Sequence, residues 1–370
     1  MSESSRAAWK LLVASIVIAT MPANAPQAQG GQGAPPPSGP AVTSIMANPY
    51  RIVPNWPNLG NIKPGAAIGI IPDGKGGLWL QHRSDPAIVH IDAAGNVVKR
   101  FDVTFSSSHG LCQDRDGNFW ALDASTFNET ADTGVRGNQI FKFNQDGKLL
   151  LTLGKPGLSK RGPDTFISPV ACISDLDGNI IIADGHWVRP RSWPQDGDRL
   201  MWLTRDGKFI KEFGQFGHGP GEFMGPHSLA FDSQGRLFVA DRSNNRIQIF
   251  DRNMNYLDDW KHFGRPSGIW ILKDDTLIVA DSESSYPGFR AVEFGIGGIA
   301  KSGENIPRNG GWKTGVRIGS AKDGSLRAFI PGTRPEGLAA EESGNVIYAG
   351  LTNGCDVSPS GGCLQKWVKK

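Results

Sequence analysis

The sequence predicts an all-β, six-bladed β-propeller, and three observations support this fold. A pattern of short apolar runs around an Asp/Gly/Asn turn recurs six times along the 370 residues. No pattern of helical period longer than two turns is apparent after the N-terminal segment. The turn residues recur every 40 to 69 residues, and a four-stranded blade with loop insertions needs a period near about 40. These turn residues are Gly76, Gly117, Gly178, Gly235, Asp275 and Gly344.

Each copy supplies the strands of one blade. The best preserved copy, PHSLAFDSQGRLFVADRSNNRIQIFD at residues 226–251, contains three apolar runs of strand length joined by turn residues. Because one blade cannot bury both of its faces, the blades are expected to stack side by side and close into a ring. The stretch YRIVPNWP at 50–57 is expected to supply the outer strand of the last blade, and residues 282–334 are the least clearly patterned. The alternative, a two-sheet sandwich, does not account for six copies in register.

The N-terminal segment predicts export. Residues 1–25 have the positive, apolar and small-residue parts of a cleaved signal peptide, although a retained signal anchor is an alternative. Residues 26–45 are rich in Pro, Gly and Gln and predict a disordered tether, so the propeller is expected to span 46–370. We therefore expect a secreted or periplasmic monomer whose mature chain has no membrane span.

The composition excludes some partners and suggests disulfides. The 39 Lys and Arg residues nearly balance 36 Asp and Glu, which does not favour binding to nucleic acid or to an acidic membrane surface. Cys355 and Cys363 bracket a short loop and are expected to form a disulfide in an oxidising compartment. Cys112 and Cys172 lie on inner strands of consecutive blades, where they form either a second disulfide or two buried thiols.

A metal site is predicted from one position of the repeat, eight residues before the turn residue. In chain order this position holds Ile68, His109, Val170, His227, Ser267 and Glu336. Ligand-type side chains thus occupy the second, fourth and sixth blades, an arrangement with threefold symmetry about the channel axis. Two imidazoles and one carboxylate suit a catalytic Zn²⁺ with one open position, and Fe²⁺ or Mn²⁺ as alternatives. Polar residues that line a hydrated channel are the other interpretation.

Further polar residues follow the second strand of several copies. An aspartate six residues after the turn residue recurs in four copies and is expected to accept backbone N–H bonds. Arg83 and Arg242 come one residue later in two copies, where guanidinium groups are suited to hold a carboxylate or form surface ion pairs. His186, two residues after Asp184, is a candidate acid or base or an exposed loop residue.

Residues 213–251 resemble an NHL repeat. Together with QHRSD (81–85), HGLCQD (109–114), ADGHW (183–187) and RPEGL (334–338), the stretch 50–369 resembles the peptidyl-α-hydroxyglycine α-amidating lyases. This resemblance implies a six-bladed propeller with zinc in its channel that converts a peptidyl hydroxyglycine into a peptide amide and glyoxylate. It implies zinc ligation by His109 and His227 and functional roles for Arg83 and Arg242.

The sequence departs from that family at the site. The third zinc histidine of the family is Glu336 here, and the tyrosine that acts as base falls on His186. A methionine and an aspartate beside the third ligand fall on Arg334 and Gly337, so a structural Ca²⁺ does not follow. In a lyase, Arg83 or Arg334 would hold the substrate carboxylate. A metal-dependent lactonase-like hydrolase and a non-catalytic NHL binding scaffold are the alternative functions.

Overall fold

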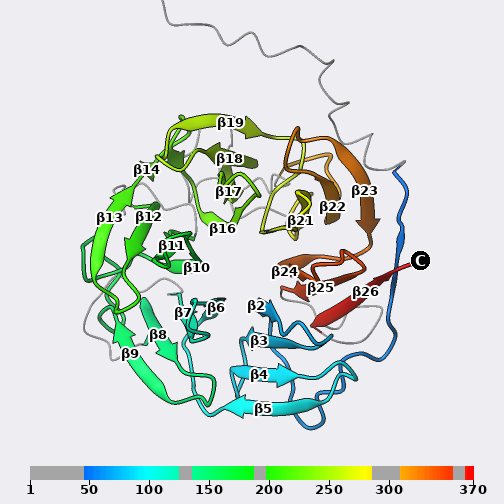
Figure 1. The fold of residues 1–370 in the computed structure, drawn as a ribbon, viewed down its shortest axis with the longest axis horizontal. Coiled ribbons are helices and arrows are strands. Elements are labelled where there is room, and N and C mark those ends of the chain that lie inside the picture. The colour runs from blue at the N-terminus through cyan, green and yellow to red at the C-terminus, as the bar shows by residue number, and fades with distance from the viewer. Residues whose placement is uncertain (1–45, 125–135, 187–196, 286–308, 353–362) are drawn as a thin grey trace, which may run out of the picture. The chain divides into compact units, whose positions relative to one another are not determined.

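The protein is a six-bladed β-propeller, as predicted (Figure 1). A computed structural model describes residues 46–124, 136–186, 197–285, 309–352 and 363–370. Within these residues the chain forms six four-stranded antiparallel sheets, one 3₁₀ turn at Arg242–Asn244 and a parallel pair of β14 (Gln215–Phe216) and β15 (Glu222–Phe223). The expected signal peptide and tether lie outside the described residues.

The first three blades each run in chain order from the axis outward. Blade 1 consists of β2 (Ala67–Pro72), β3 (Leu78–His82), β4 (Ile88–Ile91) and β5 (Val97–Phe101). Blade 2 consists of β6 (Ser108–Gln113), β7 (Phe119–Asp123), β8 (Gln139–Phe143) and β9 (Leu149–Leu153). Blade 3 consists of β10 (Pro169–Ser174), β11 (Ile180–Asp184), β12 (Arg199–Leu203) and β13 (Phe209–Phe213).

The last three blades complete the ring. Blade 4 consists of β16 (Pro226–Phe231), β17 (Leu237–Asp241), β18 (Arg246–Phe250) and β19 (Tyr256–Trp260). Blade 5 consists of β20 (Gly268–Ile271), β21 (Thr276–Asp281), β22 (Gly315–Ser320) and β23 (Leu326–Pro331). Blade 6 consists of β24 (Pro335–Ala340), β25 (Val346–Leu351), β26 (Leu364–Lys369) and β1 (Tyr50–Ile52). The N-terminal β1 thus pairs with β26 and closes the circle, as expected for the 50–57 stretch.

Six apolar clusters hold the ring together, one between each pair of adjacent blades. The inner strands β2, β6, β10, β16, β20 and β24 contact one another in sequence around the axis. Small residues on the inner strands permit this close approach. A Cβ on Gly110, for example, would lie 2.5 Å from the Val170 carbonyl oxygen of the next blade.

The recurring aspartates anchor the blades, as predicted from the sequence. Asp184 accepts backbone N–H bonds from Ile167 and Ser168, both at 2.8 Å, and pairs with the buried Arg199 at 3.0 Å. Each of the other aspartates at this position likewise accepts at least one backbone N–H, namely Asp123, Asp241 and Asp281. Each aspartate therefore ties the end of its second strand to the segment that enters the blade.

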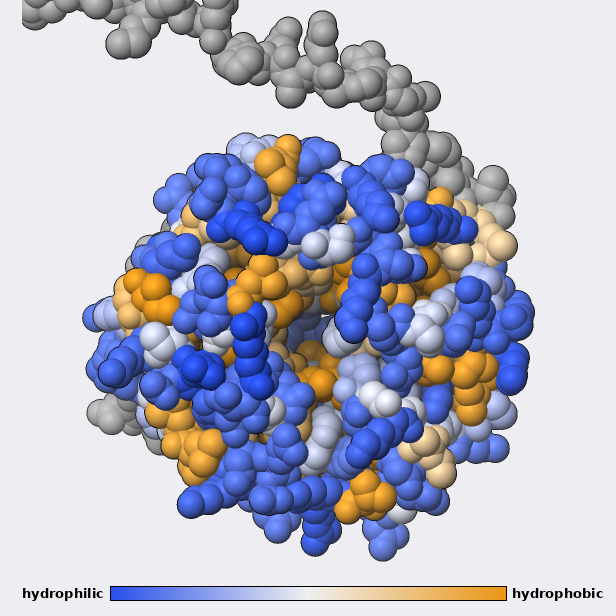
Figure 2. All heavy atoms as spheres, in the orientation of Figure 1, coloured by the Kyte–Doolittle hydropathy of each residue, from blue (hydrophilic) through white to orange (hydrophobic). Residues whose placement is uncertain are grey.

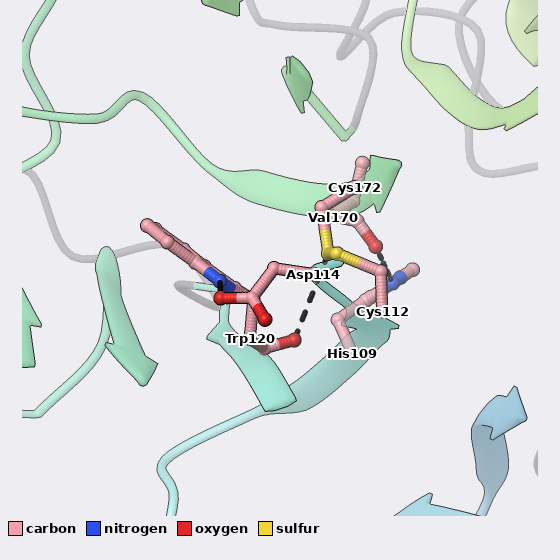
Figure 3. The surroundings of a disulfide bond; sticks show 6 residues. All are labelled: His109, Cys112, Asp114, Trp120, Val170 and Cys172. Carbon is pink, nitrogen blue, oxygen red and sulfur yellow. Dashed lines mark hydrogen bonds between the residues drawn. A yellow bond between two sulfur atoms is a disulfide. The ribbon is translucent and has the colours of Figure 1, made fainter. Parts of the chain in front are cut away.

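The three cysteines among the described residues are all disulfide-bonded. Cys112 and Cys172 form a disulfide between β6 and β10, which settles their two sequence alternatives (Figure 3). Cys363 is also disulfide-bonded, but its expected partner Cys355 lies outside the described residues. Among the described residues, no helix has the length and apolar character needed to cross a membrane.

Candidate metal centre

The start of each inner strand that holds a predicted ligand is irregular. Pairing between the first two strands shifts register between Ser108 and Leu111 in blade 2 and between Pro226 and Leu229 in blade 4. Blade 6 shows the same shift between Pro335 and Gly337. Such β-bulges redirect a side chain. The same shift occurs in blades 1 and 3, so the bulge belongs to the repeat and is not confined to the blades that hold a predicted ligand.

Four buried side chains converge on the axis. His109, His227 and Glu336 come from β6, β16 and β24, and His186 follows β11. One potential ligand atom from each residue lies within 4.8 Å of all the others. The Glu336 Oε1 atom lies 3.2 Å from His227 Nε2 and 3.5 Å from His109 Nε2. His186 Nε2 lies 3.0 Å from His109 Nε2.

The two strand histidines are oriented by the backbone of the following blade. His109 Nδ1 donates a hydrogen bond to the Val170 carbonyl at 2.8 Å, and His227 Nδ1 donates to the Ser267 carbonyl at 2.7 Å. Val170 and Ser267 occupy the same repeat position as the ligands, in blades 3 and 5. Because Nδ1 carries the proton in each ring, the Nε2 lone pair points toward the other side chains, as it does in histidines that bind metals.

The donor set fits a divalent cation. A tetrahedral ion with bonds of about 2.0–2.1 Å separates its ligand atoms by about 3.3–3.4 Å, close to the distances from Glu336 to the two imidazoles. In the described residues, His227 Nε2 is buried without a hydrogen-bond partner, and its lone pair faces the Glu336 carboxylate. Two acceptors at that separation repel each other, and a cation between them would remove the repulsion.

The protonation states also suit metal binding. Burial lowers the pKa of His227 to about 3 and lowers the pKa of His109 and, more strongly, of His186. For Glu336, burial acts to raise the pKa, but the surrounding groups, the charge of Arg83 among them, hold it well below its usual range. Neutral imidazoles and an ionised carboxylate are the forms that coordinate metals.

The three predicted arginines differ in their surroundings. Arg242 is buried, with Nη1 at 3.5 Å from Glu336 Oε1 and Nη2 donating to the His186 carbonyl. It therefore lies inside the protein beside the charge of Glu336, rather than at an open channel mouth as the sequence suggested. Arg83 and Arg334 are half-buried, and their Nε groups donate to the carbonyls of Ser108 and Ser282.

A hollow in the channel reaches the centre. It contains about 540 Å³ of empty space, open to solvent, and is lined by residues of all six inner strands, including three of the four converging residues. Figure 2 shows the depression at the middle of the ring. The sequence identified His109, His227 and Glu336 by register, and the structure brings them together. That they bind a cation stays a prediction.

His186 belongs to this cluster. It is buried, so the exposed loop residue, one of the two interpretations drawn from the sequence, is wrong, and the acid or base stays a prediction. His186 follows a strand, beyond the ladder in which the repeat fixes side-chain direction. The sequence therefore offered one indication of where His186 lies. It comes two residues after Asp184, whose carboxylate is fixed by a backbone N–H.

Comparisons with known proteins agree with this architecture. The NHL repeat family matches residues 223–250, within blade 4. Human NHL repeat-containing protein 3 is 30% identical over 247 residues, which cover 62% of this chain and 66% of the human protein. Peptidyl-glycine alpha-amidating monooxygenase B of Xenopus laevis is 28% identical over 339 residues, covering 80% of this chain and 34% of that protein. The matched regions are thus just under two thirds and about one third of those relatives.

Solved structures show the same fold at low identity. A gluconolactonase from Xanthomonas campestris has a TM-score of 0.55 at 16% identity and covers 91% of this chain and 95% of its own. Virginiamycin B lyase from Staphylococcus aureus has a TM-score of 0.51 at 17% identity and covers 87% of this chain and 100% of its own. Fold and cluster thus define a six-bladed propeller with a candidate metal centre on its axis. The chain carries an NHL repeat and is homologous to part of the peptidylglycine alpha-amidating monooxygenases.

Proposed function

We propose that the protein is an exported, metal-dependent carbon–nitrogen lyase that cleaves a peptidyl-α-hydroxyglycine into a peptide amide and glyoxylate. The observation that carries this proposal is the convergence of three buried imidazoles and one carboxylate on the axis, beside guanidinium groups. Homology to the amidating monooxygenases supports the substrate class. The Cys112–Cys172 disulfide and the N-terminal signal pattern support export.

The proposal assigns the metal to His109, His227 and Glu336. A divalent ion, Zn²⁺ by ligand type, with Fe²⁺ and Mn²⁺ as alternatives, would acidify a hydroxyl group that coordinates to it. Arg242 offsets the charge of Glu336, because its guanidinium lies 3.5 Å from that carboxylate. Arg83 or Arg334 is assigned to the substrate carboxylate, since both are half-buried and a guanidinium can bind a carboxylate through two hydrogen bonds.

The proton transfer is assigned to His186. Its imidazole is neutral at physiological pH because burial holds its pKa well below the usual range. A base with so low a pKa would take the substrate hydroxyl proton only because the cation would acidify that hydroxyl. The carbonyl of glyoxylate forms as the bond between the α-carbon and the amide nitrogen breaks. The same proton then returns to that nitrogen, so the peptide amide leaves neutral and His186 is regenerated.

The direct test is glyoxylate release from hydroxyglycine-terminated peptides by the zinc-, manganese- and iron-loaded protein. Release by one loaded form supports the lyase assignment. Arg83→Ala is expected to raise KM and also lower kcat, because the carboxylate must be oriented for cleavage. No release with any metal confirmed as bound would reject the lyase and leave a metal-dependent hydrolase or a binding scaffold. Lactone hydrolysis by the same samples would then identify the hydrolase.

A further inference from the structure

We propose that the Cys112–Cys172 disulfide is a positioning element of the metal centre, so that reducing it weakens cation binding without unfolding the ring. This inference rests on the metal site of the proposed function but not on lyase activity. The position of the disulfide in the fold supports it. The bond joins the inner strands of blades 2 and 3, the strands that hold His109 and the carbonyl that orients it (Figure 3).

On both strands, the disulfide lies within three residues of the hydrogen bond between His109 and the Val170 carbonyl. Cys112 is three residues after His109 on β6, and Cys172 is two residues after Val170 on β10. The His109 Nδ1 atom lies 2.8 Å from the Val170 carbonyl oxygen. A hydrogen bond of this kind weakens steeply when its geometry is lost. A small slip of β6 along β10 would therefore release the ring of His109 and turn Nε2 from the cluster.

Among the described residues, no backbone ladder joins β6 to β10 to oppose such a slip, although Arg115 after β6 donates to the Asp175 carbonyl after β10. The ladders run within blades, and β6 and β10 belong to different sheets. The two strands are in contact, and around the disulfide they are held by side-chain packing, which is non-directional. Their spacing is also tight, because a Cβ on Gly110 would meet the Val170 oxygen at 2.5 Å. A covalent tie at this level fixes both the spacing and the register of the two strands.

The equivalent contact between blades 4 and 5 is held without a disulfide. His227 donates to the Ser267 carbonyl in the same way, but the positions that correspond to the cysteines hold Ala230 and Ile269. Both interfaces have an apolar cluster, but only β16 and β20 are also joined by a side-chain hydrogen bond, from Ile269 N–H to the Ser228 hydroxyl at 3.1 Å. Gly110 takes the place of Ser228 in β6 and cannot make this bond. Of these two interfaces, the one at His109 contains the disulfide, so it is the one that we expect to respond to a reductant.

A reductant would reach the disulfide through Cys172, which is partly exposed, whereas Cys112 is buried. Cys172 lines the channel hollow that also reaches His109, His227 and Glu336. A water-soluble phosphine can therefore approach the sulfur from the channel. In its reaction each sulfur gains one electron and one proton, while the phosphorus loses two electrons and takes the oxygen of one water molecule. That water supplies both protons, and the products are two thiols and a phosphine oxide.

The test compares metal affinity with and without the bond. Zn²⁺ and Co²⁺ dissociation constants are measured by competition with a chromophoric chelator for the oxidised full chain and for Cys112→Ala/Cys172→Ala, which leaves no new thiol ligand. We expect affinity to fall by about 10- to 100-fold in the double variant, the range typical when support of a metal-bound histidine is lost. Circular dichroism is expected to show the same β structure in both.

Two comparisons separate positioning from general stability. In a His109→Ala background, removing the disulfide is expected to leave the residual metal affinity unchanged, because the positioned ring is absent. Cys355→Ala/Cys363→Ala is the matched control. It is expected to bind metal like the parent chain and still to lose affinity on treatment with tris(2-carboxyethyl)phosphine, with recovery after reoxidation.

The outcomes distinguish the inference from the proposed function. A double variant that melts at a lower temperature but binds metal with parental affinity overturns the positioning role. If the double variant does not fold, reversible reduction of the parent chain decides the matter, and unchanged affinity with both thiols alkylatable overturns the inference. Absence of any bound cation in the oxidised parent would overturn the inference and the metal-dependent lyase together, whereas loss of glyoxylate release alone leaves the inference intact.

Discussion

Each strand histidine of the candidate centre depends on a backbone carbonyl from the next blade. His109 and His227 donate to Val170 and Ser267, which hold the ligand position of blades 3 and 5. The non-ligand blades therefore contribute through their main chain, and their side chains at this position need not coordinate anything. Each donor and its acceptor thus lie in adjacent repeats, and three inward side chains from alternate repeats are left for one ion.

His186 is expected to act in catalysis rather than in metal retention. His186→Ala should lower kcat by about 10²–10⁴-fold, the usual effect of losing a general base, while the protein keeps its cation on the other three residues. The measurement is glyoxylate release together with metal content of the same sample. Loss of the metal from this variant, beside an intact fold, would instead make His186 a fourth ligand, which its 3.0 Å approach to His109 Nε2 allows geometrically.

At the scale of single residues, the sequence predicted those site residues whose positions are fixed by the repeat. His109, His227 and Glu336 share one register position, so their convergence could be predicted once the repeats were aligned. His186 and Arg242 follow second strands, where the ladder ends and side-chain direction depends on the loop. Arg242 is buried because its guanidinium meets Glu336 and the His186 carbonyl, two partners that come from other blades. That information is not contained in the local pattern.

At the scale of strands, buried ion pairs fix the ends of the blades. Arg199 begins β12 and is fully buried, and Asp184 at the end of β11 pairs with it while accepting two backbone N–H bonds. The sequence predicted the aspartate contacts with backbone. It did not predict the arginine partner, because hairpin pairing between β11 and β12 depends on where the intervening loop ends.

Asp184→Ala is expected to destabilise the protein by about 3–5 kcal/mol, because it removes one of the two carboxylates that pair with the buried Arg199 and leaves two buried backbone donors unsatisfied. Urea unfolding followed by tryptophan fluorescence measures the change. Asp116→Ala is the matched control, since Asp116 pairs with Arg205 at 3.0 Å on the exposed surface, where a pair contributes less than about 1 kcal/mol. Equal effects of the two substitutions would contradict the role assigned to the anchors.

The sequence also predicted the blades themselves, including the fifth, whose outer strands fall within the weakly patterned stretch 282–334. Strands β22 and β23 complete that blade. The β-bulges at the ligand position were not predicted. A bulge adds a residue to one strand without altering the alternation of apolar residues enough to be recognised in a single chain. Blades 1 and 3 have the same bulge.

At the scale of the whole molecule, closure of the ring depends on a short strand from the N-terminal side of the propeller. Strand β1 pairs with β26, and the buried Tyr50 donates its hydroxyl to the Gly344 carbonyl at 2.6 Å. The first and last parts of the described chain thus share one sheet. Propellers avoid exposed sheet edges and unpaired blades in this way.

A chain that begins at Val53 should therefore be less stable than one that begins at Met46. The shorter chain loses the β1 ladder and the burial of Tyr50, which alone contributes about 2 kcal/mol. Thermal unfolding of both chains measures the effect, and the chain from Met46 should melt like the mature protein. Equal melting temperatures for the two chains would show that β1 does not hold the ring closed.

The central claim is that one divalent cation binds on the axis of this ring. Its most direct test is elemental analysis of the purified oxidised protein beside His227→Ala and the control His218→Ala, whose histidine lies in a loop away from the centre. We expect about one metal ion per chain in the parent and the control, and little metal in His227→Ala with an unchanged circular dichroism spectrum. A metal-free parent, or full metal content in His227→Ala, would contradict this claim.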